Sequence, residues 1–368
     1  MHIPAYDVTR ANAPYKADLH KAALSVLDGG ALIMGTHLEQ FERNFAHYCG
    51  TSYCIGVGNG LDALKLALYA AGVRAGDEVL VPAFTFIATW SAVSLLGAKP
   101  VPVDVTSEGL INPDLISAAI TPRTRAIVPV HLYGRLADMS AILALAEHFG
   151  LVVIEDAAQA HGARRNGQRA GSFGLASAFS FYPTKNLGAF GDGGAICTND
   201  TDMAYACYQL RNYGSTVKYY HDSIGWNTRL DDLQAALLDI KLADLDASNI
   251  RRTQVAQYYH SFLSCFQELQ CPNMGDVDMV WHHFVLLTEK RKYLQESLLN
   301  LGVHTGVHYP VAPFDQPCYK NTYNRDQYPQ AIALSNTVLS LPMGDYLQDN
   351  ELQYITSAIR KVCEAQKS

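Results

Sequence analysis

The sequence lacks any apolar run close to the roughly 20 residues that a helix needs to cross a membrane, so we expect no membrane span. Its first residues also lack the charged and then apolar layout of a signal peptide, which favours a cytoplasmic location. Positive charge is in short supply, since 28 lysines and arginines stand against 35 aspartates and glutamates. The formal net charge of −7 therefore predicts neither nucleic acid nor an anionic membrane as a partner.

Paired cysteines and metal-binding spacings are also missing. The eight cysteines include no Cys-x-x-Cys pair, and several lie inside apolar runs, so we expect buried free thiols. No His-Glu-x-x-His motif occurs. His304 and His308 are four residues apart, but their segment is predicted as strand and loop, which does not bring them onto one helix face. The sequence therefore predicts no metal site.

What the sequence does contain is a regular alternation of short apolar runs with amphipathic helices. Strands are predicted at residues 53–57, 78–82, 101–105, 126–131, 151–156 and 195–198. Short β-rich runs that alternate with helices are typical of an α/β fold, in which helices cover both faces of a mostly parallel sheet. In such sheets, ligands bind beyond the carboxyl ends of the strands.

A long helical pattern across residues 249–269 divides the chain into two predicted domains. Residues 1–248, which include an N-terminal helical segment, form the large domain, and residues 249–368 form a smaller C-terminal α+β domain. The smaller domain is predicted to contain strands at 284–287 and 303–309 and helices at 293–301, 331–341 and 350–364.

A glycine-containing turn, Gly58-Asn59-Gly60, joins the first predicted strand to a clear helix. Backbone amides at a helix N-terminus bind anions, and phosphate is the usual occupant. The turn also fits a loose dinucleotide-binding fingerprint, which expects an acidic residue at the end of the next strand. Glu78 lies at the beginning of that strand instead, so the sequence favours a phosphate site over a nicotinamide site.

A single lysine, Lys185, follows an aromatic run and precedes a glycine-rich loop within residues 177–196. Desolvation in such surroundings lowers the pKa of an amine, as a Schiff-base lysine requires. Asp156 follows a buried strand and can face a ring nitrogen, and Phe84 or Phe86 can stack on a ring. With the turn at Gly60, these residues supply what pyridoxal phosphate needs: an amine, a carboxylate, an anion cradle and an aromatic.

Each of these residues also has a simpler structural explanation. Asp156 can be a helix N-cap, and Asn227 a turn or cap residue. Gln159 and Ser180 can be ordinary polar groups with satisfied hydrogen bonds, and Lys185 an ordinary loop lysine. The functional interpretation therefore rests on their convergence at one site.

Three sequence blocks carry a resemblance to a known family. They are Glu-Asp-Ala-Ala-Gln-Ala-His-Gly at 155–162, Ser-Phe-Tyr-Pro-Thr-Lys-Asn-Leu-Gly at 180–188 and Gly-Asp-Gly-Gly at 191–194. They resemble the nucleotide-sugar aminotransferases of the DegT/DnrJ/EryC1/StrS group, whose fold is that of aspartate aminotransferase (fold type I). The resemblance extends from about Gly35 to Tyr309, and it implies a transaminase dependent on pyridoxal 5'-phosphate.

The resemblance implies a role for each residue around the cofactor ring. Lys185 binds the cofactor covalently and later moves the proton between the cofactor carbon and the sugar carbon. Asp156 pairs with the pyridine nitrogen, and Gln159 lies beside the ring hydroxyl. Phe86 is the stacked aromatic, which leaves Phe84 as a core residue.

The resemblance also implies how the phosphate is held. Gly60, Leu61 and Ser180 match its contacts. Many relatives have threonine or serine where this chain has Leu61, so only the backbone amide can serve there. Asn227 matches an asparagine that reaches the phosphate across a dimer interface, which implies a homodimer with shared active sites.

The neighbours of the lysine indicate the position of amination. Relatives that act at C4 often have histidine where this chain has Tyr182 and Asn186, and the present pattern resembles the branch that aminates 3-keto-6-deoxyhexoses carried on dTDP. The implied reaction moves an amino group from L-glutamate to such a sugar and gives a dTDP-3-amino-3,6-dideoxyhexose. Galacto (Fuc3N) and gluco (Qui3N) products both remain open.

Further residues match blocks that lie near the substrate in the family. These are His161, Lys218, Tyr219, Arg229, His308 and Tyr309. His161 can instead fill the pocket wall. Two alternative functions remain: the same chemistry at C4 or on a keto-cyclitol, and a non-catalytic regulatory role. Relatives that dehydrate at C3 have histidine in place of the lysine, so Lys185 argues against that activity.

Overall fold

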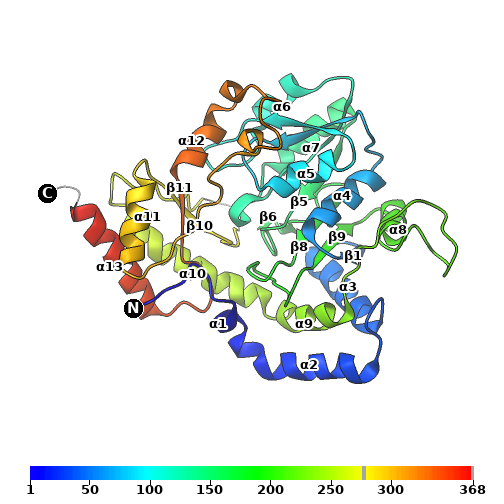
Figure 1. The fold of residues 1–368 in the computed structure, drawn as a ribbon, viewed down its shortest axis with the longest axis horizontal. Helices are drawn as coiled ribbons and strands as arrows, with labels where there is room; N and C mark the ends of the chain where they lie inside the picture. Colours follow the sequence, from blue (N-terminus) through cyan, green and yellow to red (C-terminus); the bar gives the residue numbers. More distant parts are fainter. Residues whose placement is uncertain (276–278, 366–368) are drawn as a thin grey trace.

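The computed structural model describes residues 1–275 and 279–365. Its centre is a seven-stranded sheet in the order β1-β9-β8-β5-β4-β2-β3, in which β9 runs antiparallel to both neighbours and the other strand pairs are parallel (Figure 1). The strands are β1 Tyr53–Val57, β2 Glu78–Pro82, β3 Lys99–Val103, β4 Thr124–Ile127, β5 Val152–Asp156, β8 Ala176–Ser180 and β9 Gly194–Thr198. The mostly parallel α/β sheet predicted from the alternation is confirmed.

Helices cover both faces of this sheet. One face packs on α4, α5 and α8, and the other packs on α3 and α9 at one end and on α6 and α7 at the other. Successive residues of β2 show the two sides, because Val79 and Val81 belong to the first core and Leu80 to the second. The helices are α3 Thr36–Cys49, α4 Gly60–Ala70, α5 Ile87–Ser94, α6 Pro113–Ala119, α7 Met139–Phe149, α8 Thr201–Leu210 and α9 Asp232–Leu242. Burial on both faces explains why the strands read as continuous apolar runs.

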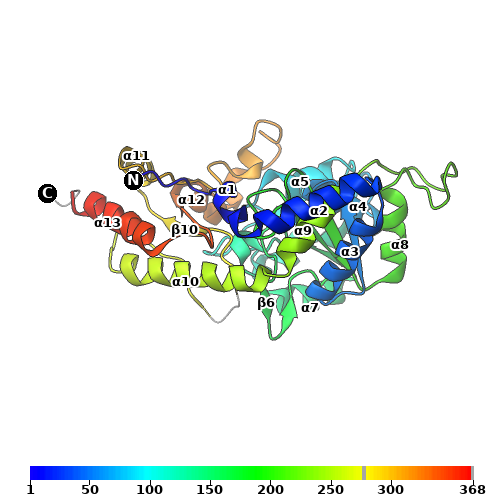
Figure 2. The same cartoon turned by 90° about the horizontal axis from the view of Figure 1, so that it is seen from below.

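Most of the remaining elements form a second group at the other end of the molecule, whereas α12 packs against the core of the large sheet (Figures 1 and 2). The helix α10 leads there from beneath the sheet, and a separate apolar core lies between it, α11, α13 and a two-stranded antiparallel sheet. These elements are α10 Leu245–Leu263, β10 Phe284–Leu287, α11 Arg291–Asn300, α12 Pro329–Thr337, β11 Val338–Leu341 and α13 Asp349–Ala365. We retain the division into two domains as a proposal that this second core supports, although residues 248 and 249 both lie within α10.

The chain begins against this second group and then crosses to the large sheet. Ile3 forms a parallel bridge with Val303, after which the N-terminal helices run along α9. These helices are α1 Val8–Asn12 and α2 Lys16–Gly29. Between β5 and β8 the chain also forms a short antiparallel hairpin of β6 Arg164–Arg165 and β7 Gln168–Arg169. Among the residues described, no helix is both long and apolar enough to cross a membrane.

Two predictions about the C-terminal part were wrong. The predicted helix over 331–341 ends at Thr337, and Val338–Leu341 forms the strand β11, because these residues pair with β10 in the buried sheet. The predicted strand over 303–309 is irregular, and its only β-bridges to described residues are the isolated ones at Val303 and Gly306. Both differences reflect tertiary pairing that a short apolar run does not specify.

Candidate active site

A cavity of about 360 Å³ lies where the carboxyl ends of β5 and β8 meet the N-terminus of α4. The predicted site residues on its lining are Gly60, Leu61, Phe86, Asp156, Gln159, Ser180, Tyr182, Lys185, His308 and Tyr309. We call the side formed by Gly60, Asp156, Ser180 and Lys185 the floor. We call the side formed by His282, His283, His308 and Tyr309 the wall. Residues that are far apart in the sequence, from Asn59 to Tyr309, thus line one cavity around the amine of Lys185.

Lys185 provides that amine. Its backbone amide donates to the carbonyl of Tyr182 at 2.8 Å, which fixes the turn after β8. Burial lowers the pKa of Lys185 to about 8, and the nearby Asp156 carboxylate opposes this shift. A useful fraction of the amine is therefore unprotonated near neutral pH, as a nucleophile or a proton acceptor requires.

Asp156 is the last residue of β5 and is buried at the bottom of the cavity. The Thr89 hydroxyl donates to its Oδ2 at 2.8 Å, and the Ala158 amide donates to its Oδ1 at 3.2 Å. Burial raises the pKa of Asp156, while these hydrogen bonds and the positive charge of Lys185 oppose the rise. No residue in the described part of the chain forms a salt bridge with it, so this buried carboxylate suits a cationic ring N–H.

The N-terminus of α4 supplies the predicted anion cradle. Asn59 caps the helix by accepting from the Asp62 amide at 2.8 Å, and its carbonyl accepts from Ala63 at 3.0 Å. The Gly60 and Leu61 amides make no hydrogen bond within the described residues, so both can donate to an anion. A Cβ on Gly60 would lie 2.7 Å from the Ser180 Cβ, which is why glycine is required here.

Aromatic and amide groups complete the cavity above the floor. Phe86 precedes α5 and is 51% exposed, with its ring centroid 5.4 Å from that of Tyr309. Phe84 is fully buried in the core, as expected. Gln159 accepts from the Tyr133 amide at 2.7 Å and donates to the Tyr309 hydroxyl at 2.9 Å, so both its side-chain groups are oriented.

These features fit pyridoxal phosphate. The unpaired buried carboxylate suits its ring nitrogen, the two free amides suit its phosphate, and an exposed phenyl ring can cover its face. The amine with a lowered pKa suits its aldehyde. The convergence of these groups on one cavity supports the functional interpretation, while the Ser180 hydroxyl also accepts from the Tyr182 amide at 3.3 Å, as an ordinary polar residue can.

Two predicted substrate residues lie behind the lysine and not on the cavity lining. Asn186 is buried, and its amide donates to Asn249 at 2.9 Å and to the Val280 carbonyl at 2.8 Å. His161 is fully buried against Phe179, and burial lowers its pKa to about 3. Neither ring nitrogen of His161 has a hydrogen-bond partner in the part of the chain described. Both residues support the loop from beneath.

Four other predicted residues lie on the segment after α8 and are not on the cavity lining of their own chain. Thr228, between Asn227 and Arg229, nevertheless contacts Gly58 and Asp62 at the start of α4. This segment projects from the body of the molecule (Figure 1). Tyr219 is 82% exposed near its tip, beside Lys218, and Asn227 is exposed where the segment returns. Arg229 donates to the Asn212 side chain at 2.9 Å. None of the four lines the cavity.

Sequence reasoning missed several cavity residues. His282 and His283 line the wall, and Thr89 supports Asp156. Thr85 and Thr89 are four apart at the start of a helix that follows a strand, and this spacing was the available signal for Thr89. Nothing in the local pattern around 281–283 marks the histidines, because tertiary packing alone brings them to the cavity.

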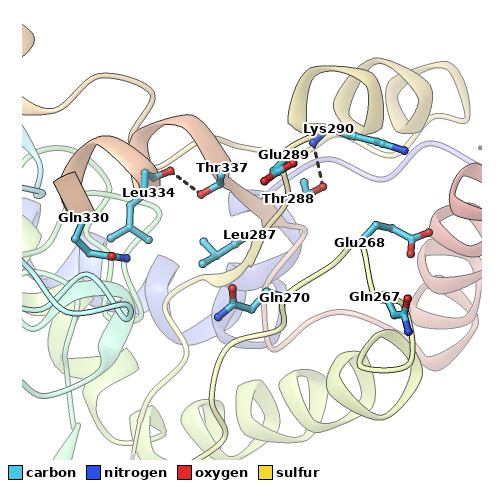
Figure 3. Close-up of a pocket in the computed structure, with 11 residues that line it drawn as sticks. Gln267, Glu268, Gln270, Leu287, Thr288, Glu289, Lys290, Gln330, Leu334 and Thr337 are labelled. Carbon is cyan, nitrogen blue, oxygen red and sulfur yellow. Dashed lines mark hydrogen bonds between the residues drawn. The ribbon is translucent and has the colours of Figure 1, made fainter.

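A larger hollow of about 530 Å³ lies in the small group of elements and shares no lining residue with the Lys185 cavity. Gln330, Leu334 and Thr337 of α12 border it, opposite Glu268 (Figure 3). Its described lining is rich in amide and charged side chains, and its one lysine, Lys290, is exposed. Size alone therefore does not mark the active site.

Comparison with known proteins identifies relatives along almost the whole chain. The model of the DegT/DnrJ/EryC1/StrS aminotransferase family matches residues 15–360. The dTDP-3-amino-3,4,6-trideoxy-alpha-D-glucose transaminase of Streptomyces venezuelae is 46% identical over 365 residues, which are 98% of this chain and 96% of that protein. The dTDP-3-amino-3,6-dideoxy-alpha-D-galactopyranose transaminase of Aneurinibacillus thermoaerophilus is 44% identical over 98% of this chain and 99% of that protein.

A solved structure agrees with the fold at the same level. The crystal structure of S. venezuelae DesV in complex with a ketimine intermediate is similar with a TM-score of 0.96 and 46% identity. The similarity covers 99% of each chain. The architecture predicted from the sequence blocks is therefore confirmed.

Proposed function

This chain belongs to the DegT/DnrJ/EryC1/StrS aminotransferase family, and from that premise we propose that it transfers the amino group of L-glutamate to C3 of a dTDP-linked 3-keto-6-deoxyhexose. It is a nucleotide-sugar aminotransferase that depends on pyridoxal phosphate. The proposed product is a dTDP-3-amino-3,6-dideoxyhexose for glycan or natural-product biosynthesis.

The choice of acceptor rests on two relatives. Both are named for dTDP sugars that carry nitrogen at C3, and each is at least 44% identical to this chain over 98% of its length. Their sugars differ at C4, which carries a hydroxyl in the galactopyranose and none in the trideoxyglucose, so they support the nucleotide and the aminated carbon and leave galacto and gluco products both open.

The floor holds the cofactor in this proposal. When bound, pyridoxal phosphate supplies an electron-accepting ring that stabilises the charge left after a C–H bond breaks. Asp156 would keep the ring nitrogen protonated, and Gln159 and Phe86 would contact the ring. The amides of Gly60 and Leu61 and the hydroxyl of Ser180 would hold the phosphate.

Lys185 then moves the proton. A protonated amine cannot accept a proton from carbon, so the lowered pKa of about 8 increases the active fraction at neutral pH. The same amine, once protonated, can return the proton to the sugar carbon. The lysine therefore serves as acceptor and donor in turn.

A homodimer completes the site. The projecting segment after α8 places Lys218 and Tyr219 far from the cavity of its own chain, with large side chains in solvent. We assign this segment, together with Asn227 and Arg229, to the phosphate and substrate of the partner subunit. Mixing a Lys185→Ala variant with an Asn227→Asp variant should then restore about a quarter of the wild-type activity through heterodimers. No gain on mixing would contradict shared sites.

We propose that Tyr182 and Asn186 influence in different ways which sugar carbon is aminated. Tyr182 is 54% exposed on the cavity and can touch the sugar directly. Asn186 acts through the lysine loop, which its amide fixes to Asn249 and Val280. His161 supports the same loop, because its carbonyl accepts from Asn249 at 2.9 Å.

The protein is proposed to work in the cytoplasm. All eight cysteines are free thiols, which suits a reducing compartment. Five of the eight are buried, as expected from the apolar runs around them.

The observation that carries the proposal is the placement of the Lys185 amine, the Asp156 carboxylate and the free amides of α4 around one cavity. The test is to incubate the holoenzyme with L-glutamate and either dTDP-3-keto- or dTDP-4-keto-6-deoxyhexose, and to locate nitrogen in the product by NMR. Amination of the 3-keto sugar is expected. Amination of the 4-keto sugar alone would establish C4 as the position instead.

A further inference from the structure

Two imidazole rings form a parallel stack on the wall of the cavity. The centroids of His283 and His308 are 3.9 Å apart, with an angle of 13° between the rings. Both side chains line the cavity that contains Lys185 and keep part of their surface open to it. His282 lies 4.0 Å from His283 but is buried, and its Nδ1 is engaged with the Asn186 side chain at 3.2 Å. The stacked pair is therefore the part of this cluster that a ligand can reach.

The hydrogen bonds of the pair leave it able to bind a ligand in more than one protonation state. The His308 Nδ1 lies 2.8 Å from the Ser340 hydroxyl, which can either donate or accept. The Nε2 of His308 is therefore free of a fixed role. The His283 ring makes no hydrogen bond to the residues that the structure describes. Among the described residues, no hydrogen bond occupies the His308 Nε2 or the ring nitrogens of His283.

The acidic groups on the cavity lining disfavour an acidic ligand unless other side chains there can become cationic. Asp156 and Asp192 are acidic, and the cofactor phosphate would add more negative charge. Lys185 is the one lysine or arginine among the described lining residues of the same chain, the projecting segment that we assign to the neighbouring site being counted separately, and it must be unprotonated to act. A dicarboxylic amino donor brings two further negative charges into this cavity. The side chains of the lining that can newly become cationic near neutral pH are the histidines.

We propose that His283 and His308 bind a carboxylate of the dicarboxylic amino donor, and that the pair takes up one proton from solvent as the donor binds. This inference rests on the proposed glutamate donor. A carboxylate beside an imidazole favours the protonated ring, and the hydrogen bond that results is charge-assisted. A charge on either ring disfavours protonation of the other, so only one of the two rings takes up the proton.

The surroundings keep the pair neutral before the donor arrives. Burial lowers the pKa of His308 to about 4, and the positive charge of Lys185 adds to the shift. Burial also lowers the pKa of His283, as do His308, Lys185 and Arg252. The titratable and charged groups that surround the pair are Tyr6, Tyr133, Asp156, Lys185, Arg252, His282 and Tyr309. An incoming carboxylate favours the protonated ring and so opposes these shifts, and acidification toward pH 6 should therefore strengthen donor binding.

The test uses the holoenzyme and glutarate, a dicarboxylate without an amino group. Calorimetric titrations in buffers of different ionisation enthalpy report the protons taken up per glutarate. We expect uptake that approaches one proton near pH 7, and tighter binding at pH 6 than at pH 8. His283→Gln and His308→Gln should each weaken glutarate by about tenfold or more and reduce the uptake. His148→Gln, an exposed histidine on α7, is the matched control and should change neither quantity.

Two outcomes would overturn the assignment. One is glutarate binding without proton uptake in the wild-type enzyme, and the other is unchanged glutarate affinity in both variants that melt at the wild-type temperature. The reaction of the wild-type holoenzyme with L-glutamate alone, followed through the cofactor absorbance, separates this from the proposed function. If L-glutamate leaves the absorbance unchanged, the proposed donor is wrong. If it reacts but the His283→Gln variant keeps the wild-type KM for L-glutamate, only the histidine assignment fails.

Discussion

The floor and the wall of the Lys185 cavity are built in different ways. The floor lies at the ends of β5, β8 and α4, where neighbouring strands and a helix cap fix each group. The wall comes from residues 282–283 and 308–309, which lie outside regular strands and meet through ring contacts. The floor matches the needs of the cofactor, and the wall carries the histidine pair that we propose binds the amino donor. Most of the floor is thus fixed by strand ends and a helix N-terminus, whereas the wall depends on contacts between irregular segments.

The largest expected effect tests the floor at its amine. Lys185→Ala should lower turnover by about 10³-fold or more, because both the covalent link and the proton acceptor are lost. Borohydride reduction followed by peptide mapping should label Lys185 in the wild-type protein. Lys241 is the internal control, since burial lowers its pKa to about 8 as well, yet it lies off the cavity. Label on Lys241 would show that a lowered pKa alone selects the lysine.

The next effect tests the carboxylate of the floor. Asp156→Asn should retain bound cofactor but reduce kcat by about 10²-fold, because an amide cannot hold the ring nitrogen protonated. Cofactor content by absorbance and kcat with saturating substrates are the measurements. Thr89→Val, which removes only the hydroxyl that donates to Asp156, should cause a smaller loss. Full activity of Asp156→Asn would refute the assigned role.

The floor and the wall are expected to respond to pH in opposite directions. For the sugar half-reaction, kcat should fall about tenfold per pH unit below a pKa near 8, because protonation removes the acceptor amine of Lys185. Binding of a dicarboxylate to the wall should improve over the same acidification. Single-turnover rates and glutarate affinity between pH 6 and 9 provide the two curves. If the rate and the glutarate affinity both fall on acidification, the floor and the wall do not respond to pH in opposite directions and the contrast is wrong.

The smallest effect concerns the connection between the regions. Asn186→Ala removes the donor to the buried Asn249 Oδ1 and to the Val280 carbonyl and should lower the free energy of unfolding by about 1–3 kcal/mol. Urea denaturation measures this loss. Gln40→Ala, at an exposed hydrogen bond on α3, should cost less than about 0.5 kcal/mol. If Asn186→Ala is as stable as Gln40→Ala, the buried amide does not hold the lysine loop.

The same contrast explains what the sequence could predict. Lys185, Asp156 and Gly60 stand in short segments whose local pattern, a strand followed by a glycine turn or an abrupt acid, already carries the geometry. His283 reaches the cavity only after the second group of elements docks on the sheet, which no local period encodes. Asn186 follows the lysine directly, yet its side chain turns to Asn249, and the direction of one side chain in a loop is a tertiary outcome.

The close approach of α4 to β8 has a consequence for mutational tolerance. Gly60 has the Ser180 Cβ at 2.7 Å from where its own Cβ would lie, so even alanine would force the phosphate-binding amides away from the floor. Gly191 belongs to the Gly-Asp-Gly-Gly block at 191–194. The nearest atom to a Cβ placed on Gly191 is the Gln234 side-chain nitrogen at 3.3 Å. In a saturation library selected for turnover, position 60 should return glycine alone, whereas position 191 should return several small residues.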